Sequence, residues 1–489
     1  PALAQWWTAF GDAQLDALVA RALEGNFDLR AADARIRESR AAEALTSADL
    51  WPALNSSAAY KRLQNQKTEA PSSKPAFGGA SASLSQTGLS PSVTLLPSGV
   101  AGPVVTVSPD LTGAGNSRVT VSTGQGGASA GVPRHADLFQ AGFDARWELD
   151  VFGGTRRELE AARATSEAAV EARRDVQVML TAEIAKNYFD LREAQTGLDI
   201  SANNIEIQRH SLDIVRSRFD AGLTNELDVK HAEAQLAATE AIVPIYAARI
   251  QYAIHRLGVL LGGAPGALQD ELAPTAALPP TPPEVPVGLP ADVLRRRPDV
   301  RRAERDLAAA TARIGVATAD LYPKLSLMGT LTSQDDALYG LKRGANLLWS
   351  IGPGIQWPVF DAGRIRANIK IQTARQEQAL AAYEKTVMIA LEDAENALVA
   401  YAKEQNRLYS LDKAVEANRS AVAMATDLYS QGLVNYLDVL VAQRSLTSTE
   451  EQQVQSRAAV LTDLVALYKA LGGGWEEEAE TEVAAKEPK

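Results

Sequence analysis

The stretch from Asp28 to Leu54, DLRAADARIRESRAAEALTSADLWPAL, decides the fold because it occurs twice in the chain. Its second copy, DVRRAERDLAAATARIGVATADLYPKL, runs from Asp299 to Leu325 at a constant offset of 271 residues. A second set of matches has a constant offset of 210 residues and joins Trp147, Gly153, Gly222, Asp228 and Leu261 to Trp357, Gly363, Gly432, Asp438 and Leu471. The repeat predicts one body built from two similar halves, with the extra length of the first half confined between Pro52 and Trp147.

Composition excludes several classes of protein. The 489 residues carry a formal net charge of −11, which argues against a nucleic-acid partner, because such binding needs a basic face. The absence of cysteine excludes disulfides, thiolate metal sites and a cysteine nucleophile. The four histidines have no spacing that suits a metal, and no catalytic or phosphate-binding pattern indicates an enzyme or a cofactor. No run approaches the roughly 18 to 20 apolar residues of a membrane-spanning helix.

A long segment without proline predicts a helical rod in each half. Between Arg156 and Phe219 the only glycine is Gly197, and apolar residues recur every seven positions. This row is Ile184, Leu191, Leu198, Ile205, Leu212 and Phe219, and its second copy is Ala394, Tyr401, Leu408, Val415, Val422 and Tyr429. A sustained seven-residue period places one apolar stripe along a helix that must pack on another helix. At 1.5 Å per residue, the 64 residues give a coiled-coil rod of about 96 Å.

Each rod is followed by a turn and a return helix. Gly222 suits the left-handed conformation that ends helices, and Asn225 is a preferred N-cap. The return helix is predicted from Glu226 to about Leu261, a length of about 54 Å. The helix from Asp28 to Leu50 adds about 35 Å, so the two short helices together nearly equal the long one. We therefore expect two short helices stacked end to end beside one long helix, twice over.

Alternating sequences predict a two-stranded hairpin in each half. After Pro323, leucines alternate with polar residues, and a second alternating run ends at Trp357. Strands of about ten residues with aromatic residues near their ends are typical of outer-membrane strands. Four strands cannot close a barrel, so oligomerisation must supply the rest, and three chains would give twelve strands around an aqueous lumen. The segment 70–136 is rich in Gly, Ser, Thr and Pro and is predicted to be a long mobile loop outside the first hairpin.

Four motifs carry a resemblance to a known family. They are Gln5-Trp6-Trp7, the segment WELDVFG from Trp147, the segment GLPADVLRRRPD from Gly288, and the segment LYKALGGGW from Leu467. Together they span nearly the whole chain. The sequence resembles the TolC/OprM-like outer-membrane factor family, in particular its lipoprotein efflux branch.

The resemblance implies a mainly α trimer with a small β part. It implies a twelve-stranded β-barrel in the outer membrane of a Gram-negative bacterium, with four strands from each chain in contact with outer-membrane lipid. A long coiled-coil α-helical barrel would extend through the periplasm, with an equatorial belt of small elements. The duct would serve a tripartite pump together with a periplasmic adaptor protein and an inner-membrane transporter of the RND type. Lipoprotein members carry a palmitoylated N-terminal cysteine, so lipidation is implied only if residues precede Pro1.

The family pattern also divides the chain into segments. The first structural repeat covers 26–262, with a helix at 26–51, a strand hairpin at 52–150 that holds the loop 70–136, and a helical hairpin at 155–262. The second repeat covers 291–472, with a helix at 291–322, a strand hairpin at 323–360 and a helical hairpin at 364–472. The segments left for the equatorial belt are 1–25, 263–290 and 472–489.

The resemblance also implies a gate at the periplasmic tips of the helical hairpins. The matching gate positions are Asp228 on the first hairpin and Tyr429, Leu437, Asp438, Val441 and Arg444 on the second. The tip pairs Gly222-Leu223 and Gly432-Leu433 match the turns that dock the adaptor. A ring of leucines can block hydrated solutes by dewetting and a ring of carboxylates attracts cations, which makes Leu437 the plug and Asp438 the filter.

Two features of the tips bear on this assignment. Some relatives have arginine or a second acid where this chain has Val434 and Val441, which predicts a more hydrophobic lock. Asp228 and Asp438 each lie three residues after an N-cap asparagine, which is the spacing of a capping box. An acid that stabilises the helix start is therefore a competing interpretation. Leu437 as ordinary helix packing and Arg444 as a solvated charge are competing interpretations too.

The sequence leaves three functional hypotheses to compare. A passive duct that exports drugs or other small toxic solutes explains the rods, the strands and the motifs. The outer-membrane channel of a type I protein secretion system is an alternative within the same family. A soluble coiled-coil scaffold would explain the seven-residue period but would leave the alternating strands without a purpose.

Overall fold

The computed structural model describes residues 3–64, 104–108, 118–122, 135–281, 295–343 and 346–475. These residues form a helical unit and a strand unit. The predicted fold class, mainly α with four strands in the principal sheet of each chain, is confirmed. The parts of the predicted segments at 65–103, 282–294 and 476–489 lie outside the described residues.

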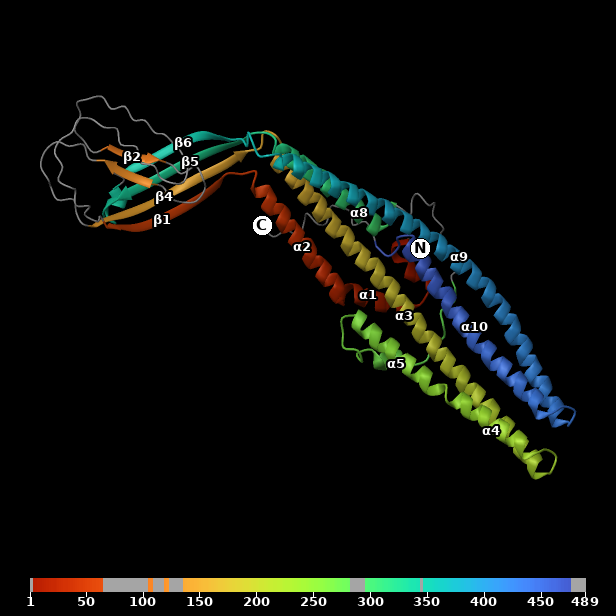
Figure 1. The fold of residues 1–489 in the computed structure, drawn as a ribbon. Coiled ribbons are helices and arrows are strands. Elements are labelled where there is room, and N and C mark those ends of the chain that lie inside the picture. Colours follow the sequence, from red (N-terminus) through yellow and green to blue (C-terminus); the bar gives the residue numbers. More distant parts are fainter. Residues whose placement is uncertain are drawn as a thin grey trace, which may run out of the picture. The chain divides into compact units, whose positions relative to one another are not determined.

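Two helices of 67 residues run through the helical unit, α3 (Gly154–Asp220) and α9 (Arg364–Ser430). Each is about 100 Å long. The helix α3 packs against α2 (Phe27–Ala48) and α8 (Pro298–Ala319), and α8 also packs against α9 (Figure 1). The helices α2, α3, α8 and α9 are therefore neighbours in that order.

The return helices differ between the two halves. In the second half α10 (Tyr436–Ala470) is continuous. In the first half the expected single helix from Glu226 to Leu261 is wrong, because it breaks into α4 (Glu226–Glu240) and α5 (Val243–Leu260). Pro244 lies at the start of α5 and lacks the backbone donor that a continuous helix requires. Among the described helices, none combines the length and apolarity needed to cross a lipid bilayer.

The largest apolar core of the helical unit lies where the N-terminal segment meets the long helices. The 3-10 helix η1 (Leu3–Phe10) and α1 (Ala13–Gly25) bury their apolar side chains there, and the short α6 (Gln269–Leu272) adds Leu272. The rings of Trp6 and Tyr468 stack with centroids 5.3 Å apart. This contact ties the start of the chain to the end of α10.

The strand unit contains one four-stranded sheet with the order β1-β4-β5-β6. Its strands are β1 (Ala53–Gln64), β4 (His135–Leu149), β5 (Lys324–Asp335) and β6 (Leu347–Gln356), with the 3-10 turn η2 (Gly340–Arg343) before β6. β1 pairs antiparallel with β4, and Ala58 lies opposite Ala141. Large apolar side chains on these strands stay exposed in one chain, among them Leu54, Phe143, Trp349, Ile351 and Ile355.

The predicted loop 70–136 needs a correction. It contains β2 (Val104–Ser108) and β3 (Arg118–Ser122), which pair antiparallel with Val105 opposite Val121. Both segments alternate valine with threonine or serine, a composition that favours strands. β4 also begins at His135, inside the predicted loop.

Candidate gate at the tips of the helical hairpins

The two helical hairpins end in the same backbone turn. Gly222 and Gly432 have φ of +70° and +78°, a conformation that glycine adopts without steric cost. The Leu223 amide donates to the Arg218 carbonyl oxygen at 2.8 Å, and the Leu433 amide donates to the Leu428 carbonyl oxygen at 2.9 Å. This closes the last turn of each long helix. Leu223 and Leu433 are each 66% exposed beyond the turn.

The acidic residues after the turns serve the starts of the return helices in different ways. At the second tip the Asn435 amide donates to Asp438 Oδ2 at 3.2 Å, which is one half of a capping box. At the first tip the Asp228 amide donates to Asn225 Oδ1 at 3.1 Å, while the Asp228 carboxylate accepts from the Thr224 hydroxyl. Within a single chain, capping is the role that these contacts support for Asp438.

A small apolar core joins the two hairpins close to their tips. It combines buried residues of α3 and α4 with buried residues at the end of α9 and the start of α10: Leu212, Val215, Val229, Ala232, Tyr429, Tyr436, Val439 and Leu440. The rings of Tyr429 and Tyr436 lie 5.5 Å apart at 60°. Tyr429 is only 5% exposed, so in one chain this candidate gate residue packs between the hairpins.

Arg218 of the first hairpin makes two contacts with the second hairpin. Its guanidinium lies 4.9 Å from the centroid of the Tyr429 ring, and its Nη1 donates to the Ser430 carbonyl oxygen at 2.9 Å. Burial is the main cause that raises the pKa of Tyr429, so the ring stays neutral near pH 7 and can accept a cation on its face. Farther along, Arg444 Nε donates to Gln235 Oε1 at 2.7 Å. Both arginines therefore join the two hairpins of one chain.

The remaining candidates form an exposed row on α10. Leu437 and Val441 are each 59% exposed, and they lie one helical turn apart. Asp438 is exposed beside them. The structure thus separates the six predicted gate residues: these three face outward from the chain, Tyr429 is buried, and Asp228 and Arg444 have partners within the chain.

Three residues that contact these candidates were missed by the sequence analysis. They are Arg218, Thr224 and Gln235. A signal was present for all three, because the positions 210 residues later hold Leu428, Val434 and Ser445 rather than the same side chains. A comparison of where the two copies differ near their tips would have marked all three positions.

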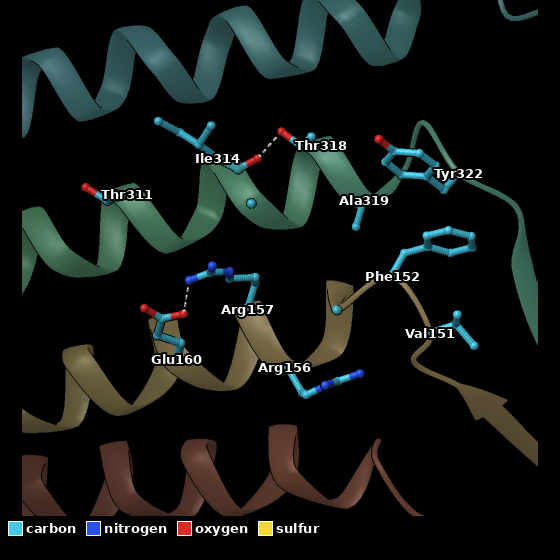
Figure 2. Close-up of a pocket in the computed structure, with 12 residues that line it drawn as sticks. Val151, Phe152, Arg156, Arg157, Glu160, Thr311, Ile314, Thr318, Ala319 and Tyr322 are labelled. Atoms are coloured by element: carbon cyan, nitrogen blue, oxygen red, sulfur yellow. Dashed lines mark hydrogen bonds and ion pairs between the residues drawn. The ribbon is translucent and has the colours of Figure 1, made fainter.

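A cavity of about 730 Å³ lies between the start of α3 and the end of α8 (Figure 2). The rings of Phe152 and Tyr322 stack over it with centroids 4.8 Å apart. Its charged groups have partners, since Arg157 pairs with Glu160 at 2.6 Å and Arg156 pairs with Asp150. Within the described part of the chain, no group of three or more His, Asp or Glu side chains could hold a metal ion. We therefore place the candidate functional site at the hairpin tips.

Comparisons with known proteins agree with the family resemblance that the sequence motifs carry. A family model described as "Outer membrane efflux protein" matches residues 108–263 and 289–473. The chain is 30% identical to the pyoverdine export outer membrane protein OpmQ of Pseudomonas aeruginosa over 96% of this chain and 88% of that protein. It is 34% identical to the solvent efflux pump outer membrane protein SrpC of Pseudomonas putida over 71% of this chain and 73% of that protein.

A solved structure also matches almost the whole chain. The outer-membrane channel OprN aligns with a TM-score of 0.79 and 35% sequence identity. The alignment covers 96% of this chain and 93% of that one. The likeness therefore includes the helical unit and the strand unit.

We predict that Arg218→Gln loosens the contact between the hairpins. The change removes the charge above the Tyr429 ring and the hydrogen bond to Ser430, which together contribute about 1–2 kcal/mol. Amide hydrogen exchange in the turn 430–436 should become faster. Arg216→Gln is the matched control, since Arg216 pairs with Glu233 on the return helix of its own hairpin. Equal exchange rates in the two variants would show that Arg218 does not hold the hairpins together.

Proposed function

The chain belongs to the outer membrane efflux protein family, and on that premise we propose that three copies form a passive exit duct. The resemblance to the TolC/OprM-like family drawn from the sequence motifs is confirmed by the family match. We place the duct in the outer membrane of a Gram-negative bacterium, with its helical part in the periplasm. The duct moves solutes without chemical change, so no catalytic residue and no cofactor is assigned.

The main support for this proposal is that the described sheet of a single chain has two unpaired edges. Among the described strands, β1 and β6 each pair on one side only, because they stand at the two ends of the sheet order. Their exposed apolar residues include Leu54, Trp349 and Ile351. An unpaired strand edge is not tolerated in lipid, whereas edge-to-edge joining of three copies would close twelve strands into a barrel. A soluble coiled-coil scaffold does not require strands with exposed apolar side chains and unpaired edges.

The helical unit supports the same arrangement. α2 and α9 stand at the two ends of the row α2, α3, α8 and α9. α9 has only five buried residues along its length of 67, whereas α3, which has the same length, has 25. A neighbouring copy that packs α2 against α9 would cover this surface. Three copies would then enclose a tube of twelve helical rows.

We propose that the exposed row on α10 closes the periplasmic end of the tube. Leu437 and Val441 would meet their equivalents from the other copies and exclude water, with Asp438 beside them as a cation filter. Tyr429, Asp228 and Arg444 would act by holding the two hairpins of each chain in position, because their partners lie within the chain.

The hairpin turns are the proposed contact for a periplasmic adaptor protein. Gly222, Leu223, Gly432 and Leu433 form small, exposed turns that allow close backbone approach. An inner-membrane transporter, which we take to be of the RND type, would supply the energy. The named relatives export pyoverdine or solvents, so we propose drugs or other small toxic solutes as cargo. The efflux relatives favour small solutes over the protein cargo of a type I secretion system.

Oligomeric state tests the proposal most directly. Native mass spectrometry of the detergent-extracted membrane fraction should give a particle of three chains of 52.1 kDa each. A single chain leaves two edges of its described sheet unpaired, and three chains together supply the twelve strands of the proposed closed barrel. A monomer in the soluble fraction would contradict the duct and favour the coiled-coil scaffold.

We predict that Leu437→Ser raises single-channel conductance and the leak of antibiotics into cells. The hydroxyl lets water wet the constriction that the leucines keep dry. Met424→Ser is the control, because Met424 is similarly exposed but lies on α9, outside the proposed constriction and the adaptor-contact turns. Unchanged conductance in Leu437→Ser, or the same rise in both variants, would remove Leu437 from the gate.

We predict that Asp438→Asn lowers the preference of the channel for cations. The amide oxygen of asparagine can still accept from the Asn435 amide, so the change removes the charge while keeping the cap. The reversal potential across a salt gradient measures this preference. An unchanged reversal potential would leave helix capping as the only role of Asp438.

A further inference from the structure

An arginine-lined cavity of about 760 Å³ lies between α2, α3 and η1, away from the hairpin tips. Its charged lining residues are Asp33, Arg37 and Arg40 from α2 and Arg173 and Arg174 from α3, and Trp475 after α10 also lines it. Four arginines and one acidic residue therefore face this cavity. Such an excess of positive charge is unusual in a chain whose formal net charge is −11.

Two of the four arginines have acidic partners. Arg173 Nε donates to Asp33 Oδ1 at 2.8 Å, and Arg174 Nη1 donates to Glu171 Oε1 at 2.6 Å. Arg37 and Arg40 are exposed and make no hydrogen bond or ion pair with any residue that the structure describes. The cavity thus presents two cations that are available to an anionic group.

The last described residue of the chain forms part of the cavity wall. Two guanidinium groups lie over the Trp475 ring, that of Arg174 at 4.6 Å from the ring centroid and that of Arg301 at 5.1 Å. Just before it, Gln177 Nε2 donates to the Gly474 carbonyl oxygen at 3.0 Å, and the Gly474 amide donates to the Leu3 carbonyl oxygen at 3.0 Å. These contacts fix the point from which residue 476 continues.

The sequence that continues from this wall is strongly acidic. Residues 476–482 read EEEAETE, so five of the seven side chains are carboxylates. Seven residues can span up to about 25 Å, which is enough to reach any wall of a cavity that the preceding residue lines. We propose that the segment 476–482 docks into the arginine-lined cavity of its own chain, with its carboxylates against Arg37 and Arg40.

Tethering makes such docking favourable although each ion pair is weak. A single exposed ion pair adds little stability, because solvent and salt screen it. A segment attached directly to the site has an effective concentration in the millimolar range, and several carboxylates can share the same cations. The interaction should therefore weaken as salt concentration rises.

Cysteine pairs test where the segment lies, because the chain has no cysteine of its own. Ile36→Cys combined with Glu480→Cys keeps both cations and should form a disulfide within one chain, several-fold faster than Ala34→Cys combined with Glu480→Cys. Ala34 is exposed on the same helix but is not among the residues that line the cavity. High salt, or Glu→Gln at positions 476, 477, 478 and 482, should remove the difference. Equal rates for the two pairs, or a disulfide between two chains, would overturn the proposal.

A peptide of residues 476–482 tests the binding site itself. A chain that ends at Trp475 should bind the labelled peptide, and the full chain should bind it at least about tenfold more weakly, because its own segment occupies the cavity. Arg37→Gln combined with Arg40→Gln should abolish the difference. Equal binding to the full and shortened chains would show only unspecific attraction and would contradict docking. Capture of anionic lipid vesicles by the shortened chain without peptide binding would assign the cavity to a lipid instead.

Discussion

The seven-residue apolar row is the constraint on which the rest of the structure depends. On α3 most of this row is buried. Ile184 and Leu191 are fully inaccessible and Ile205 and Leu212 nearly so, while Leu198 is half-buried and Phe219 at the tip is 40% exposed. A helix of this length cannot stand alone, so it must be covered along its whole length by other helices. α3 is covered within one chain, because α2, α4, α5, α8 and α10 pack against it. The duplicated row on α9 is buried or half-buried as well. The other faces of α9 leave Met388, Val399 and Tyr409 exposed, which is the physical reason to expect neighbouring copies.

The duplication fixes the backbone of the tips more strictly than their side chains. Both turns keep a glycine with positive φ and an N-cap asparagine, because the backbone reversal requires them. Around these fixed points the copies diverge. Thr224 supports the Asp228 carboxylate in the first tip, whereas Val434 at the equivalent place packs against the apolar core in the second. A repeated fold thus carries two tips with different surfaces.

The fold could be predicted from the sequence where a single local rule determines the element. The seven-residue period indicated the rods, glycine followed by asparagine indicated the turns, and alternation indicated the strands of the principal sheet. The break at Pro244 could have been read from the proline itself, but the return helix was predicted as one segment from Glu226 to about Leu261. The candidate site was less predictable, because partners such as Arg444 and Gln235 are 209 residues apart. The same separation in sequence hides the burial of Tyr429, which depends on α3 and α4 as well as on its own helix.

Tip packing also suggests how a gate of this kind would move. Arg218 and the apolar core around Tyr429 bind the two hairpins of one chain to each other, while Leu437 and Val441 have no such cover within that chain. Separating exposed aliphatic side chains of different copies costs less than opening a packed core that also holds a cation on an aromatic face. We therefore expect the hairpins of each chain to move as a pair, so that an opening stimulus acts between copies rather than inside them.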